Sequence, residues 1–183
     1  MHREEGFTLL EVMVVMVLAG ILLTLSAGAI RTFWLSQSLK GQAQGVIAQM
    51  RQAQQRAGAE THPRAYGVWF QSGSQRWGTL QYDSSDASTP CKETGQRKFE
   101  TFVRIGSVDF TDVTAPSPMT ATCRSALSTA GISNAGGVEI AFFYPRGNAT
   151  AGSVTLEQPP VNKTRTVDVV AITGRVDEYD PAP

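Results

Sequence analysis

One apolar run near the N-terminus limits what this chain can fold into. From Phe7 to Ile30 the sequence reads FTLLEVMVVMVLAGILLTLSAGAI, and Glu11 is its one charged residue. As a helix the run would be roughly 36 Å long at about 1.5 Å per residue, which exceeds the ~30 Å hydrocarbon core of a bilayer. We therefore predict that residues 7–30 span a membrane. Because a charge at mid-membrane depth costs ~2.5–3.5 kcal/mol, Glu11 is expected to have a purpose.

A cleaved secretory signal peptide is the alternative interpretation of this run. Residues 27–29 read Ala-Gly-Ala, which matches a small-residue cleavage site. Two observations argue against it: Glu4 and Glu5 precede the run, and Glu11 lies inside it. The charges give little information on orientation, because basic residues flank the run on both sides.

The residues Gly6-Phe-Thr-Leu-Leu-Glu11 resemble the type IV prepilin signal, although the leader is more acidic than is usual for that family. The resemblance implies that residues 1–6 are a leader, that a prepilin peptidase cuts between Gly6 and Phe7, and that Phe7 is then N-methylated. It further implies that Glu11 sets subunit register in a filament by neutralising the new α-amino group of a neighbouring subunit. The positive end of its own helix dipole also favours Glu11 at this position.

The helix is expected to continue past the apolar run, since no proline occurs before Pro63. Apolar residues follow at steps of three or four, and glutamines occupy the opposite face. The apolar stripe comprises Leu35, Leu39, Ala43, Val46, Met50, Ala53 and Ala57. We predict one helix from Phe7 to Ala57, stopped at Gly58, whose amphipathic half (31–58) packs under the chain's own globular domain. A coiled coil or a membrane-surface helix would also fit the spacing, but a surface helix should be richer in Lys and Arg.

Residues 59–183 are expected to form a β-rich globular domain with an acidic tail at 177–183. Short apolar stretches alternate with Gly-, Ser-, Thr- and Pro-rich connections, which predicts about seven strands in one or two antiparallel sheets. The expected strands are 66–70, 77–82, 99–105, 107–113, 138–144, 153–157 and 166–173. Residues 83–96 and 114–137 are expected to be loops. The fold class is thus α+β, with a long N-terminal helix packed against an antiparallel sheet domain, as in type IV pilins.

Cys91 and Cys123, the two cysteines, fall in the two expected loops. In an exported domain such a pair predicts a disulfide, which would contribute roughly 3–4 kcal/mol on the chain-entropy model. The alternative is a pair of free thiols in a reducing compartment.

Three C-terminal segments resemble the signature of the pseudopilin H and minor pilin group (GspH/FimT). They are FFYPRG at 142–147, GSVTL at 152–156 and VDVVAITGRV at 167–176. The resemblance marks Pro145, Gly147, Gly174 and Arg175 as family positions. Ordinary turn chemistry would also place proline and glycine there.

The composition argues against catalysis and against nucleic-acid binding. Sixteen basic and sixteen acidic residues give a formal net charge of zero, so no bulk field attracts a polyanion. Of the two histidines, His2 would leave with the leader, and the sequence has neither a Cys/His zinc cluster nor a phosphate-binding loop. We predict a protein that is not an enzyme and has no cofactor or metal.

Together the resemblances imply a minor pilin or pseudopilin of a bacterial inner membrane, a single-pass protein whose globular domain lies outside the cytoplasm. Prepilin peptidase, other pilins or pseudopilins and an inner-membrane assembly platform are the implied partners. The destination is a type IV pilus or a type II secretion pseudopilus, near the tip. Two alternatives stay open. One is a DNA-binding minor pilin for natural transformation, although Asp177 and Glu178 would repel the phosphates of DNA. The other is a major pilin, which would carry its disulfide nearer the C-terminus.

Overall fold

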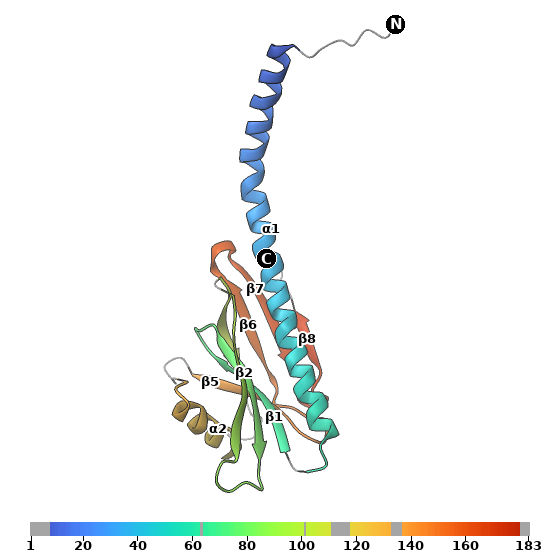
Figure 1. The fold of residues 1–183 in the computed structure, drawn as a ribbon. Helices are drawn as coiled ribbons and strands as arrows, with labels where there is room; N and C mark the ends of the chain where they lie inside the picture. Colours follow the sequence, from blue (N-terminus) through green and yellow to red (C-terminus); the bar gives the residue numbers. More distant parts are fainter. Residues whose placement is uncertain (1–7, 63, 101, 111–117, 133–136, 180–183) are drawn as a thin grey trace.

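The computed structural model describes residues 8–62, 64–100, 102–110, 118–132 and 137–179, without the side chains of 25–27, 29 and 118. One long helix, α1 (Leu9–Ala59), precedes a domain of two four-stranded sheets and a second helix, α2 (Pro118–Thr129). The first half of α1 projects beyond this domain, and the second half lies along it (Figure 1). The predicted α+β class is confirmed.

Helix α1 runs without a break over 51 residues. Thr8 caps its start, and Glu60 caps its end through a backbone bond from its N–H to the carbonyl of Ala57. The continuous helix is confirmed, but the predicted stop at Gly58 is wrong: that residue lies inside the last turn, and the helix ends one residue later.

The first sheet contains the hairpin expected from the sequence. Its strands are β1 (Arg64–Gln71), β2 (Arg76–Asp83), β3 (Cys91–Lys98) and β5 (Val138–Phe143), in the spatial order β3-β2-β1-β5. All pairs are antiparallel, and Phe70 lies opposite Trp77 beside the hairpin turn.

The second sheet has the order β4-β6-β7-β8 and is also antiparallel throughout. Its strands are β4 (Arg104–Asp109), β6 (Gly152–Gln158), β7 (Lys163–Val169) and β8 (Val176–Tyr179). A short 3-10 helix, η2 (Pro159–Val161), links β6 to β7.

Four expectations about the domain are corrected by the structure. The expected loop 83–96 contains most of β3, and the expected loop 114–137 contains α2. Where strands were expected at 99–105 and 107–113, the described residues form one strand, β4, and residues 101 and 111–113 lie outside the described residues. The first residues of the expected acidic tail, 177–179, belong to β8. Strands β3 and β8 lie at sheet edges, where side chains can stay polar, so hydrophobic alternation did not reveal them.

Two apolar clusters hold these layers together. One lies between α1 and the two sheets, and the other lies between the first sheet and α2. Six of the seven stripe residues of α1 are buried, from Leu39 to Ala57, while Leu35 is half-buried. The predicted packing of the amphipathic half under the domain is therefore confirmed.

Candidate functional site

The projecting half of α1 exposes nearly all of its large apolar side chains. From Leu9 to Trp34, those described are 47–74% exposed. Exposed apolar surface on this scale marks a site of contact with a membrane or another protein. Within the described ranges, none of the helices combines the length and the apolar character that a membrane crossing requires.

Glu11 lies in the first turn of this projecting helix. The hydroxyl of the capping residue Thr8 accepts a hydrogen bond from the backbone N–H of Glu11 at 3.3 Å. The spacing of Thr8 and Glu11 is that of a capping box, in which both residues favour a helix start. The carboxylate of Glu11 is exposed and makes no hydrogen bond or ion pair with another described residue. The predicted cleavage and methylation residues, Gly6 and Phe7, lie outside the described residues.

The predicted C-terminal motif residues gather near the end of α1. Pro145 and Gly147 belong to a tight turn in which the N–H of Gly147 donates to the carbonyl of Tyr144 at 3.0 Å. Gly147 has a φ of 85° and Gly174 a φ of 60°, both in the left-handed region that favours glycine. The two glycines adjoin, since a Cβ on Gly174 would lie 3.0 Å from the carbonyl oxygen of Gly147.

Polar side chains of α1 bind the same region. The Gln54 amide donates to the carbonyl of Thr173 at 3.0 Å, and the Arg51 guanidinium donates to the carbonyl of Val176 at 3.3 Å. These bonds connect the last turns of α1 to the turn between β7 and β8 and to the first residue of β8. The motif glycines therefore lie where the end of α1 packs against the turns of the domain.

Arg175, the motif cation, is already paired. Its Nε lies 2.6 Å from a carboxylate oxygen of Asp177 in an exposed ion pair. The positive charge that a polyanion would need at this position is thus partly neutralised by Asp177, two residues further along the chain.

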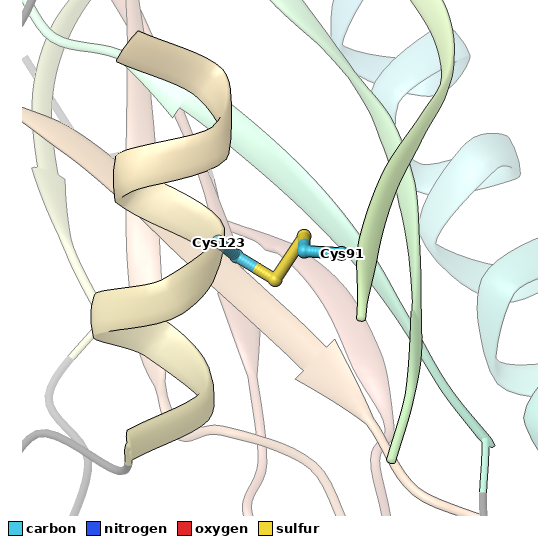
Figure 2. Close-up of a disulfide and its surroundings, with 2 residues drawn as sticks. All are labelled: Cys91 and Cys123. Carbon is cyan, nitrogen blue, oxygen red and sulfur yellow. A yellow bond between two sulfur atoms is a disulfide. The ribbon is translucent and has the colours of Figure 1, made fainter. Parts of the chain in front are cut away.

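The predicted disulfide joins Cys91 and Cys123, with the two Cα atoms 5.2 Å apart (Figure 2). Neither cysteine lies in a loop: Cys91 begins β3, and Cys123 lies within α2. Both are buried. The bond therefore fastens α2 to the edge strand of the first sheet.

A polar cluster that sequence patterns did not indicate lies where α1 meets β1. Arg64 donates to the Asp83 carboxylate at 2.7 Å, and the Tyr66 hydroxyl donates to the Glu60 carboxylate at 2.9 Å. Hydrogen bonds from Ser85 and then from Arg64 lower the pKa of Asp83 to about 2. Burial, together with the bond to Glu60, raises the pKa of Tyr66. The spacing of these residues in the sequence does not predict a cluster, because they become neighbours only in the folded domain.

Glu60 and Arg64 also line a groove of about 570 Å³ beside His62, Tyr82 and Tyr144. Among the described residues there is no group of three or more His, Cys, Asp or Glu side chains that could hold a metal ion.

Comparison with known proteins agrees with the sequence motif and with the fold. Residues 1–27 match the family model of the prokaryotic N-terminal methylation motif. No curated protein matches the chain in sequence. The fold is similar to that of the minor pseudopilin EpsH from the type 2 secretion system of Vibrio cholerae, with a TM-score of 0.54 and 13% identity over 80% of this chain and 99% of that one. The chain thus joins a prokaryotic N-terminal methylation motif at residues 1–27 to a fold similar to that of a minor pseudopilin.

Proposed function

We propose that this chain is a minor pilin or pseudopilin subunit. It is cut between Gly6 and Phe7, N-methylated at Phe7 and assembled through α1, near the tip of a type IV pilus or a type II secretion pseudopilus. One observation carries the proposal. The methylation motif at residues 1–27 includes the first turns of α1, a helix whose first half exposes its apolar side chains and whose second half is packed on the domain.

Before assembly the subunit is held in the bacterial inner membrane by the apolar run 7–30, with the globular domain outside the cytoplasm. The Cys91–Cys123 disulfide supports this placement, because disulfides persist in oxidising compartments such as the periplasm. The partners at this stage are the prepilin peptidase and the inner-membrane assembly platform.

During assembly Glu11 pairs with the α-amino group of a neighbouring subunit. Cleavage creates that cation at residue 7, and the exposed carboxylate of Glu11 has no partner among the described residues. An unpaired carboxylate is costly in an apolar bundle, so the pair favours one register over others. The role is structural, and we expect neither catalytic activity nor a cofactor.

The test compares Glu11→Gln with Glu11→Asp in the full chain. Intact mass of the purified subunit should show loss of residues 1–6 and one added methyl group for both variants. Glu11→Gln should stay in the membrane fraction and be absent from sheared filaments, because the amide cannot neutralise the α-amino group. Glu11→Asp should restore part of the incorporation. Incorporation of Glu11→Gln at the wild-type level would refute the role of the charge, and an uncleaved leader in the wild type would refute the proposal as a whole.

DNA binding and a major-pilin role are the alternatives to this function. The ion pair between Arg175 and Asp177 weakens the first, because it occupies the motif cation. The disulfide lies mid-chain and fastens α2 to β3, which is the observation that favours a minor over a major subunit.

A further inference from the structure

Exposed aromatic and proline side chains gather where α1 leaves the globular domain. Phe33 and Trp34 on the helix are 60% and 69% exposed, and Phe102, before β4, is 49% exposed. Pro159 and Pro160 of η2 are exposed as well. We call these five residues the aromatic collar.

The two parts of the collar lie at about the same height along α1. The Ser38 hydroxyl donates to the Glu100 carboxylate at 2.7 Å, which brings the β3–β4 connection against the helix. Ser38 follows Trp34 by one helical turn, a rise of about 6 Å. The link between β6 and β7, which contains η2, lies at the end of the domain from which α1 projects (Figure 1), and η2 contacts the helix.

On the globular domain, the residues of the collar share one hollow. Phe102, Pro159 and Pro160 line one hollow of about 330 Å³. The Gln75 amide donates to the carbonyls of Glu100 and Val103 at 3.1 and 3.3 Å, and the Val103 side chain is fully buried. Gln75 therefore holds the backbone at Glu100 and at Val103, on either side of Phe102.

We propose that the aromatic collar lies in the lipid headgroup region while the subunit waits in the membrane. The inference rests on the membrane stage of the proposed function and names the surface of the globular domain that touches the bilayer. Aromatic side chains concentrate at this depth because their rings are apolar and their edges tolerate water.

The dimensions of the helix agree with this placement. Leu9 to Ile30 measures roughly 33 Å at ~1.5 Å per residue, close to the hydrocarbon thickness of about 30 Å. Each headgroup layer adds about 5–8 Å, and Trp34 lies about 6 Å beyond Ile30 along the helix axis. The exposed cations Arg31, Lys40 and Lys163 flank the collar or lie close to it in sequence, where they can reach lipid phosphates.

Tryptophan fluorescence of the full chain in vesicles of phosphatidylethanolamine and phosphatidylglycerol tests the proposal. Trp69 and Trp77 are buried, so Trp34→Phe provides a background that lipid quenchers should not reach. Phe102→Trp in that background then reports on the domain side of the collar. Pro160→Trp in the same background is a second reporter in case Phe102→Trp disturbs its connection.

A nitroxide on the lipid headgroup should remove most of the added emission of Phe102→Trp, and a nitroxide deep on the acyl chain should remove little. The wild-type Trp34 emission should respond in the same way. If Trp34 is quenched and neither added tryptophan is quenched, the proposal that the collar lies in the headgroup region is refuted. The proposal that the apolar run holds the subunit in the membrane is then retained. A blue-shifted but unquenched added tryptophan would mean that another subunit covers the surface, which also overturns the proposal. If Trp34 itself is not quenched, the membrane stage of the proposed function fails.

Discussion

Gly147 and Gly174 meet beside the last turns of α1, where a Cβ on Gly174 would lie 3.0 Å from the Gly147 carbonyl oxygen and 3.0 Å from Nε2 of Gln54. Both glycines have positive φ, but a Cβ on Gly147 would meet no atom within 4 Å. Gly147→Ala should therefore cost about 1–2 kcal/mol of unfolding free energy from backbone strain alone. Gly174→Ala should cost more, because the turn or Gln54 must also shift. Urea unfolding of the full chain in detergent measures both, and equal losses would show that the crowding at Gly174 carries no energy.

The Cys91–Cys123 disulfide should stabilise the domain through α2. The double substitution Cys91→Ser and Cys123→Ser is expected to lower the unfolding free energy by roughly 3–4 kcal/mol, because the bridge restricts the unfolded chain. The same loss should follow from adding reductant to the wild type, and reductant should leave the double variant unchanged. Two titratable thiols in the native wild-type protein would contradict the bond.

Periodicity predicted α1 well because one physical pattern governs it: residues such as Ala43 and Met50 recur on a single helical face and are buried there. The strands that were missed lack such a pattern. Strand β3 reads CKETGQRK, and at a sheet edge its stability comes from backbone pairing with β2, which leaves no apolar signature. Helix α2 is held in place by the disulfide from Cys123 to Cys91 of β3, and local helix propensity gives no information on that bond.

The candidate site likewise contains residues that the sequence reveals and contacts that only the structure reveals. Glu11 stood out because a charge inside an apolar run is a local anomaly that one sequence displays. The contact of Gly147 with Gly174 depends on how two turns from different parts of the second half of the chain meet at α1. The acidic residues after Arg175 could be recognised in the sequence as repulsive to phosphate, but the ion pair between Arg175 and Asp177 is visible only in the structure.

The buried stripe of α1 should carry much of the domain's stability. Met50 is fully buried between helix and sheets, so Met50→Ala should cost ~2–5 kcal/mol through lost burial and a residual cavity. Met16→Ala is the matched control, since Met16 is 70% exposed on the projecting half, and its cost should stay within about 0.5 kcal/mol. Chemical denaturation in detergent measures both. A loss for Met16→Ala as large as that for Met50→Ala would mean that the projecting half packs on the domain.

DNA binding should be absent or weak. The ion pair between Arg175 and Asp177 and the formal neutrality of the chain leave little charge for phosphate contacts. The full chain in detergent should give no salt-sensitive gel shift with duplex DNA at low salt. Asp177→Asn, which frees Arg175, should raise any residual binding, and Arg175→Ala should not lower the wild-type level. A strong wild-type shift that Arg175→Ala abolishes would favour the DNA-binding alternative.

The cluster at the start of β1 should make stability depend on pH in the acid range. The pKa of Asp83 is about 2 in the folded protein, because Ser85 and Arg64 donate hydrogen bonds to its ionised carboxylate. The unfolded chain titrates this group near an ordinary aspartate pKa of about 3.9, so its contribution is fully present above that value. It is lost as the pH falls from about 4 to about 2, where the folded form takes up the proton as well.

Asp83→Asn should therefore unfold more easily than the wild type at neutral pH, and the difference should shrink towards pH 2. Asp168→Asn is the control, since the Asp168 carboxylate makes no hydrogen bond or ion pair with the described residues. Urea midpoints of the two variants and the wild type, measured between neutral pH and about pH 2, decide the question. A difference between Asp83→Asn and the wild type that stays constant over this range would show that the loss comes from packing, because only the ionised carboxylate loses its bonds with acid.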